Sequence, residues 1–156
     1  MRIQNLHTEV WLPRSREEVF PFFTDAGNLE VLTPAWLRFW ILTPLPIEMK
    51  AGRLIDYRIR LHGLPLRWRS EITVWEPPAR FVDEQRRGPY RLWAHEHQFV
   101  EGAGGTLVID HVRYAVWGGR LIEAWFVRPD LGRIFAFRRE RLLTLFGNPS
   151  DSGASR

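Results

Sequence analysis

Apolar and polar residues alternate with a period of two in two neighbouring stretches of the chain. In residues 55–62 the odd-numbered positions are apolar and the even-numbered positions polar, and in residues 66–74 the even-numbered positions share one face, apolar except for Ser70. Because successive side chains of a strand point to opposite faces, both stretches are typical of half-buried β-strands. Gly63 and Pro65 indicate a turn between them. We therefore expect an antiparallel pair with one face toward water.

Residues 81–114 predict three further strands, but here polar residues occupy inward positions. Asp83 and Gln85 follow Phe81 in phase. In the next strand one face collects aromatic and imidazole side chains, those of Trp93, His95, His97 and Phe99. An unpartnered buried polar group costs about 1–3 kcal/mol. These side chains therefore require partners, water or a ligand.

A glycine-rich tip, residues 102–105, predicts the register of the hairpin between the last two strands. If these four residues form the loop, Glu101 faces Thr106. Three inward pairs then follow, namely His97 with Asp110, His95 with Val112, and Trp93 with Tyr114. This register places a carboxylate beside an imidazole on the aromatic face.

Signals for short helices follow the first predicted strand. Residues 3–12 alternate loosely, and Ser15 with Glu18 then forms a capping box that starts a short helix. Residues 29–33 can make a second short helix. The apolar run 36–43 predicts the second strand.

A long amphipathic helix is predicted near the C-terminal end. An apolar connector, residues 121–127, which can form a short helix, precedes Pro129, and a helix tolerates proline as its first residue. An inward stripe then recurs at spacings of three and four, formed by Leu131, Ile134, Phe135, Arg138, Leu142 and Leu145. We expect Gly147 to end the helix as a C′ residue.

This order of elements predicts an α+β fold, in which a curved antiparallel sheet of about seven strands wraps around the long C-terminal helix. Two short helices follow the first strand. A sheet that grips one helix in this way encloses a hydrophobic space. We expect residues 1–147 to form a single domain and residues 148–156, rich in Ser, Gly and Asp, to be a disordered tail.

Composition removes several classes of function. The chain has no cysteine, which excludes disulfides, thiolate zinc sites and a cysteine nucleophile. It has no Gly-x-Ser-x-Gly elbow, and its glycine run joins two strands, so neither a serine hydrolase nor a nucleotide phosphate loop is expected. Eight Trp and ten Phe among 156 residues are many, and large aromatic side chains can wall a cavity as well as fill a core.

The charge pattern predicts neither nucleic-acid binding nor stable membrane insertion. The formal net charge is +4, and the arginines are dispersed among acidic residues through most of the chain. The densest basic patch, residues 128–141, fits the solvated face of an amphipathic helix. The chain shows no basic leader followed by an apolar run, and no stretch of about 18 apolar residues. We therefore expect a cytoplasmic protein.

The element order and a set of motifs resemble the START-like helix-grip superfamily (SRPBCC), which includes polyketide cyclase/dehydrase and lipid-transport proteins. The motifs are Trp11 to Phe20, Phe81 to Gln85, Gly88-Pro89-Tyr90, Trp93, His95-Glu96-His97, Phe99, Asp110, Tyr114, and Ile134-Phe135 with Arg138. More narrowly, they look like a small bacterial ligand-binding subgroup. The resemblance covers about residues 3–147.

The resemblance implies a cavity between the concave face of the sheet and the C-terminal helix. The residues it implies around that cavity are Tyr57, Ile59, Trp68, Ile72, Gln85, Trp93, His95, His97, Val112, Tyr114, Ile134, Phe135 and Arg138. We add Asp83, because alternation turns it to the same side as Gln85. No cofactor is expected.

The two histidines allow three interpretations. With Asp110, His95 or His97 could form an acid–base centre, because a neutral imidazole accepts a proton while a carboxylate orients it. The histidines could instead be structural, closing the cavity floor through hydrogen bonds to Asp110, Asp83 or Gln85. The spacing His95-x-His97-x-x-x-Glu101 also resembles the first cupin motif, but the downstream histidine is missing, so we expect no metal site.

We predict a protein that binds a small hydrophobic ligand, a lipid, polyketide or other apolar metabolite, in this cavity. Arg138 on the inward stripe would meet a ligand carboxylate or phosphate, or pair with an acidic side chain of the protein. The alternative is a cyclase/dehydrase- or isomerase-type enzyme that uses a histidine general base in the same cavity. A third interpretation is an interaction module whose core has collapsed shut. The sequence does not indicate the oligomeric state.

Overall fold

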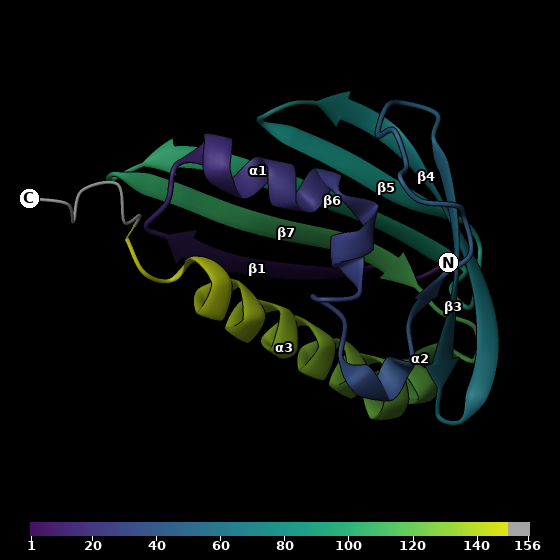
Figure 1. The fold of residues 1–156 in the computed structure, drawn as a ribbon. Helices are drawn as coiled ribbons and strands as arrows, with labels where there is room; N and C mark the ends of the chain where they lie inside the picture. The colour runs from purple at the N-terminus through teal and green to yellow at the C-terminus, as the bar shows by residue number, and fades with distance from the viewer. Residues whose placement is uncertain (150–156) are drawn as a thin grey trace, which may run out of the picture.

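The computed structural model describes residues 1–149 and confirms the predicted helix-grip architecture. A seven-stranded antiparallel sheet curves around the long helix α3 (Figure 1). The strands are β1 (Gln4–Leu12), β2 (Trp40–Ile41), β3 (Leu54–Leu61), β4 (Leu64–Glu76), β5 (Arg80–Arg87), β6 (Leu92–Gly102) and β7 (Gly105–Ala115). The helices are α1 (Arg16–Thr24), η1 (Ala26–Leu29), η2 (Ala35–Leu37), α2 (Gly119–Ile122), η3 (Glu123–Val127) and α3 (Arg128–Phe146). Of the predicted tail, residues 148–156, everything from position 150 on lies outside the described residues.

The strand order, β1-β7-β6-β5-β4-β3-β2, explains how the concave face is covered. From β2 onward each strand pairs with the next in the chain, whereas β1 and β2 lie at opposite edges. The segment that joins them must therefore cross the sheet, and it carries α1, η1 and η2. Together with α3, this segment covers the concave face of the sheet (Figure 1).

The predicted register of the β6–β7 hairpin is confirmed at every pair. Trp93 pairs with Tyr114, His95 with Val112, His97 with Asp110, and Glu101 with Thr106. The turn is tighter than predicted, because Gly102 pairs with Gly105 and leaves only two residues in the loop. Both loop residues adopt positive φ, 54° at Ala103 and 76° at Gly104, as the two-residue turn requires.

The predicted second strand, residues 36–43, is mostly wrong. The structure has a 3₁₀ turn, Ala35–Leu37, followed by a strand of only two residues, Trp40–Ile41. Arg38 ends the turn in the left-handed region with φ 47°, which breaks the extended path that an apolar run suggests. Phe39 next to it packs on Tyr57 rather than continuing a strand, with ring centroids 4.9 Å apart.

The connector before Pro129 is helical, one of the conformations that its sequence allowed, and it is continuous with α3. Residues 119–146 are helical throughout, and the π-helical turn η3 lies just before Pro129. In this turn the Arg128 N–H donates to the Glu123 carbonyl, five residues back. Such widening accommodates a proline, whose ring would clash with the carbonyl four residues earlier in a regular helix. Gly147 ends α3 with φ −73°, so the left-handed C′ conformation that we expected is not adopted.

The interface between sheet and helices divides into two apolar clusters. We call one the closed end, formed by Val10, Leu12, Val19, Phe20, Phe23, Leu32, Ile72, Phe81, Phe99, Val108 and Leu142. We call the other the open end, formed by Ile59, Trp68, Trp93, Val112, Tyr114, Leu131 and Phe135. Helix α1 supplies much of the closed end, and its N-cap Ser15 accepts a hydrogen bond from the Glu18 N–H at 3.2 Å, as predicted.

Candidate functional site

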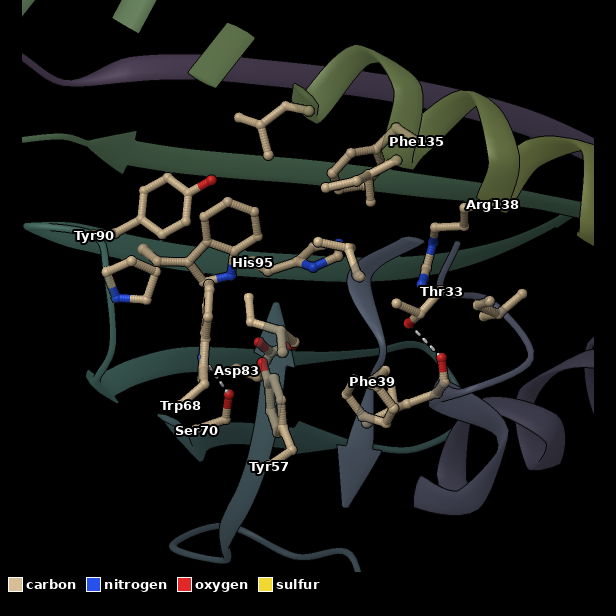
Figure 2. A pocket seen from close by; sticks show the side chains of 18 of the residues that line it. Thr33, Phe39, Tyr57, Trp68, Ser70, Asp83, Tyr90, His95, Phe135 and Arg138 are labelled. Carbon is tan, nitrogen blue, oxygen red and sulfur yellow. Dashed lines mark hydrogen bonds between the residues drawn. The ribbon is translucent and has the colours of Figure 1, made fainter. Parts of the chain in front are cut away.

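A cavity of about 410 Å³ lies between the concave face of the sheet, the crossing segment and α3. This volume is within the range of about 300–1,000 Å³ that is usual for small-molecule sites. Figure 2 shows Trp68, Tyr57, Phe39, Tyr90 and Phe135 around it. Most of the surface that faces the space is apolar, and β5, β6 and α3 contribute the polar side chains of Asp83, His95, His97 and Arg138.

The wall on β3 and β4 is a set of packed aromatic rings centred on Trp68. The Tyr57 ring stacks on Trp68 with centroids 5.7 Å apart and planes within 16°. Trp93 meets Trp68 edge-on at 5.4 Å. The Trp68 indole Nε1 donates to the Ser70 hydroxyl at 3.1 Å, which fixes the orientation of the ring (Figure 2). The wall is therefore rigid and flat, and its indole N–H is already satisfied.

The polar side of the cavity is a network of five side chains that we call the polar layer: His95, His97, Asp83, Asp110 and Arg138. Asp110 is its centre. It binds the His95 Nε2 at 2.7 Å and accepts from the Arg138 Nε and Nη2 at 3.2 and 3.1 Å. Burial alone would raise the pKa of Asp110, but the Arg138 charge and the bond from His95 hold that pKa well below its usual range.

His97 is held neutral because both of its ring nitrogens have partners. Its Nε2 lies 2.7 Å from the Asp83 carboxylate, and the Arg138 Nη2 donates to its Nδ1 at 3.3 Å. Arginine has only donors, so Nδ1 is the acceptor and the proton resides on Nε2. Burial, reinforced by the neighbouring His95, lowers the pKa of His97 to about 4. The ring is also clamped, stacking on Phe81 at 4.1 Å and on His95 at 3.7 Å.

His95 differs from His97 in having one nitrogen left over. Its Nε2 faces an ionised carboxylate, Asp110, and is therefore the donor. Its Nδ1 forms no hydrogen bond with any side chain or backbone group among residues 1–149 and is not among their fully enclosed atoms without a partner. His95 lines the cavity (Figure 2), so its Nδ1 is available to a bound molecule. The site thus offers one oriented basic nitrogen at the end of an apolar space.

Two further polar groups of the cavity are weak acids. Burial raises the pKa of Tyr57 well above its ordinary value, and the nearby Asp83 charge raises it further. Burial also raises the pKa of Tyr90 above its ordinary range. Both phenols are therefore neutral at physiological pH and can act as hydrogen-bond donors to a ligand.

At the polar layer a metal ion would compete with hydrogen bonds that the potential ligand atoms already form. Asp83, His95 and His97 have potential ligand atoms within 4.8 Å of one another. However, the Nε2 of His97 is engaged with Asp83, and the Arg138 guanidinium contacts the other nitrogen of the same ring. A cation bound there would have to break the first bond and lie beside a fixed positive charge. The donor set therefore suits a permanent organic cation, Arg138, better than a metal.

Most of the residues predicted around the cavity line it. These are Tyr57, Ile59, Trp68, Ile72, Asp83, Trp93, His95, His97, Ile134, Phe135 and Arg138. Four others are placed differently. Asp110 lies behind His95 and supports it, and Val112 is fully buried in the sheet–helix packing. Gln85 bonds the Tyr90 backbone N–H and carbonyl at 3.0 and 2.8 Å, and the Tyr114 hydroxyl donates to Glu123 at 2.9 Å.

Sequence reasoning missed the cavity residues outside the regular strands. Phe39 was assigned to a strand, and Leu32, Leu37 and Tyr90 were not assigned to the cavity, although all four line it. A usable signal was present for Tyr90, since Gln85 pointed inward five residues before it without an obvious partner. The crossing segment gave no such signal, because its apolar residues follow no period.

Comparison with known proteins supports the geometry. The family model described as polyketide cyclase / dehydrase and lipid transport matches residues 12–141. Protein CV1439 from Chromobacterium violaceum is 12% identical, with 92% of this chain and 98% of that one aligned and a TM-score of 0.72. The ZhuI aromatase/cyclase from a Streptomyces species is 11% identical, with coverages of 92% and 93% and a TM-score of 0.70. Ginseng major latex-like protein 151 from Panax ginseng is 10% identical, with coverages of 92% and 97% and a TM-score of 0.67.

At these identities the likeness to solved structures concerns the fold alone. A search of curated proteins finds no match to the chain. The catalytic or binding role of each side chain therefore has to be argued from its own contacts.

Proposed function

The chain belongs to the polyketide cyclase / dehydrase and lipid transport family, and on that basis we propose that it binds a small, mostly apolar molecule that carries one polar group. The observation that carries this proposal is the form of the cavity. About 410 Å³ of mostly apolar space borders a polar layer in which the Nδ1 of His95 forms no hydrogen bond within residues 1–149.

The polar layer favours a neutral ligand group over a charged one. The ionised Asp110 and Asp83 offset the charge of Arg138, whose Nε and Nη2 donate to Asp110 and His97, while its Nη1 forms no hydrogen bond within residues 1–149. A ligand carboxylate would meet the ionised Asp83 and Asp110 nearby and would be repelled. A hydroxyl group, in contrast, can donate to the His95 Nδ1 and accept from the Tyr57 phenol. We therefore propose an alcohol, phenol or enol as the polar group.

The apolar wall favours a flat ligand body. The stacked pair of Tyr57 and Trp68 presents a broad rigid surface, and Phe135 from α3 lies on the other side of the cavity (Figure 2). Aromatic faces gain most from offset stacking against another ring. Burial of apolar area, worth about 25 cal/mol per Å², supplies most of the affinity.

Ligand binding is tested first by native mass spectrometry of protein purified from its host, followed by denaturing release of any bound compound. A second test uses the neutral dye Nile red. Replacing Ile134→Trp on α3 fills the cavity and should abolish saturable dye binding, whereas Glu140→Trp on the exposed face of the same helix should leave it unchanged. If both variants bind the dye like the parent protein, the cavity is not the binding site.

A second candidate function is catalysis by His95 as a general base, and the His95–Asp110 pair favours it. A carboxylate that fixes one nitrogen of a histidine and leaves the other facing the substrate is a common arrangement for proton abstraction. His97 suits this role less, because Arg138 occupies its second nitrogen.

The two functions are separated by His95→Gln, tested on the compound recovered from the host. An enzyme should lose about 10²–10⁴-fold in the rate of conversion of that compound. A binding protein should show no conversion in either form and only a modest change in affinity.

A further inference from the structure

The rim of the cavity carries an exposed apolar segment. Between β7 and α3, residues 117–126 place four large side chains mostly in solvent. Trp117 is 64% exposed, Leu121 71%, Trp125 74% and Phe126 50%. Apolar side chains gathered in this way on a protein surface mark an interaction site. We call residues 117–126 the rim segment.

The rim segment lies between the cavity and the exterior. Gly118 and Gly119, with φ 90° and 75°, turn the chain out of β7 directly into α2 and η3. Trp117, Ile122 and Phe126 also line the cavity, so the segment contacts the interior with part of its surface. Leu121 and Trp125 take no part in that lining and face outward. In Figure 1 this segment is the turn of helix labelled α2 and its continuation into α3.

The acidic residues of this region face inward while their basic partners face outward. Glu123 and Asp130 are only 4% and 5% exposed. The side chains of their ion-pair partners Arg128 and Arg133 are 63% and 62% exposed. Residues 117–133 contain no other acidic residue. The outer surface therefore presents guanidinium groups with no exposed carboxylate among them.

Two further arginines add to this basic surface. Arg120 lies within the rim segment, and the Arg91 guanidinium lies 5.1 Å from the centre of the Trp117 ring. Both residues are exposed, and neither forms an ion pair within residues 1–149. The sequence alone does not predict this basic surface, because Glu123 and Asp130 lie among its arginines in the sequence. Both side chains are buried in the fold.

We propose that the rim segment docks on the surface of a membrane rich in anionic lipids. Trp125 and Leu121 enter the boundary between headgroups and acyl chains, where amphipathic aromatic and aliphatic side chains are favoured. Arg120 and its neighbours contact lipid phosphates. No helix within the described part of the chain is long and apolar enough to span a bilayer, so the docking is peripheral.

Charge selects a membrane over a second copy of the chain as the occupant of this surface. A symmetric dimer through the rim segment would bring the same patch together from both copies. Arg91 and Arg120, which form no ion pair within residues 1–149, would then lie near the same arginines of the other copy, whereas Arg128 and Arg133 are balanced by Glu123 and Asp130. An anionic lipid surface complements the same patch without that repulsion.

The chain has no cysteine, so one introduced thiol reports on one position. Leu121→Cys carries an environment-sensitive dye, NBD, into the rim segment. Val100→Cys is the matched control, an exposed aliphatic position that is 46% exposed on β6. The label at 121 should brighten several-fold with equimolar phosphatidylcholine and phosphatidylglycerol vesicles, and little with phosphatidylcholine alone. The label at 100 should not respond to either.

Vesicle sedimentation of the unlabelled chain measures the contribution of single side chains. Trp125→Ser should abolish most of the binding, and Arg120→Gln should weaken it about fivefold. Arg67→Gln, at an exposed position of β4, should have no effect. All three sites are exposed, and thermal unfolding verifies that the variants remain folded.

Two results would overturn the proposal. One is equal brightening at positions 121 and 100, or none at either position with anionic vesicles. The other is a dimer in analytical ultracentrifugation that Trp125→Ser converts to a monomer, without vesicle binding, which would assign the surface to a second copy. Docking needs no bound ligand, so its failure would leave Nile red binding in the cavity, and hence the proposed function, untouched.

Discussion

The sheet and its helices pack together in two ways within one interface. At the closed end α1 inserts Phe20 and Phe23 against Phe99, with ring centroids 5.1 and 4.9 Å apart. Four members of this cluster, Phe23, Leu32, Ile72 and Phe81, also border the cavity. At the open end the covering elements are the 3₁₀ turns η1 and η2, and a cavity of about 410 Å³ results. The strands curve continuously through both regions.

The difference shows that the crossing segment, rather than the sheet, decides where the cavity lies. A helix of two turns and more presents a stripe of side chains that reaches the sheet, whereas a single 3₁₀ turn presents few. The polar layer lies at the boundary, where His97 stacks on Phe81 of the closed end and on His95 of the cavity. Stability and ligand binding should therefore respond to different residues.

Phe99→Ala should destabilise the packing of the closed end without affecting the cavity. The side chain is 1% exposed, and its removal should lower the free energy of unfolding by about 4 kcal/mol, as measured in urea. Nile red affinity should stay the same. Trp68→Ala at the open end should cost less stability, because its ring already borders empty space, and should weaken dye binding. Equal stability losses with equal dye binding would contradict the division.

Arg138→Met should disrupt the polar layer, which lies at the boundary between the two ends. It leaves the buried carboxylate of Asp110 without its cationic partner, which should lower the free energy of unfolding by about 4 kcal/mol. The neighbouring substitution Arg139→Met, at an exposed position, provides the control and should cost about 1 kcal/mol or less. Similar losses for both would show that Asp110 does not depend on Arg138.

Lowering the pH should reduce the stability of the folded protein through protonation of His97, which lies at the boundary between the two ends. The unfolded chain binds a proton at this residue near pH 6.5, whereas burial lowers the folded pKa to about 4. Between pH 4 and pH 6.5 the unfolded state therefore binds more protons than the folded state. The free energy of unfolding should fall by on the order of 3 kcal/mol as the pH decreases from 6.5 to 4. Losses below pH 4 should come from Asp83 and Asp110, whose pKa values are also lowered.

The variant His97→Gln isolates the contribution of His97 to this pH dependence. Glutamine can still donate to Asp83 but does not titrate. Urea unfolding of the variant should be nearly independent of pH between 6.5 and 4. A slope as steep as that of the parent protein would assign the acid sensitivity to another group.

Ser70→Ala should have the smallest effect on stability and on dye binding, and it tests the open end separately from the closed end. It leaves the Trp68 indole N–H without its acceptor, which should cost about 1 kcal/mol and shift dye binding by a small factor. Ser15→Ala at the N-cap of α1 should cost about as much stability. Because that cap supports the closed end, dye binding should not change.

The sequence was most informative where structure depends on neighbouring residues. The β6–β7 register follows from a short glycine-containing turn and a period of two, and all four predicted pairs are present. The side-chain bonds, however, run diagonally. His97 pairs with Asp110 across the backbone ladder but bonds Asp83, while Asp110 bonds His95. Arg138 enters from a distant helix and draws both Asp110 oxygens toward itself, which strand periodicity cannot foresee.

The remaining errors arise where the chain departs from regular periods. An apolar run such as residues 36–43 has the composition of a strand, and only tertiary packing makes it a cavity cover. The burial of Glu123 depends on Tyr114 and Arg128 together, and that of Asp130 on Arg133 and the β3–β4 turn. Such arrangements need the three-dimensional fold before they can be recognised.

The π-helical turn allows the orientation of the rim segment to change independently of α3. A π turn amounts to one residue inserted into an α-helix, and each residue turns the helix by about 100°. Loss of a single codon within Glu123–Val127 would rotate α2 by that angle relative to α3. Leu121 would then point in another direction while the face of α3 that packs on the sheet stayed unchanged. The outer surface of this protein can thus be redirected by one deletion, without altering the packing of α3 on the sheet.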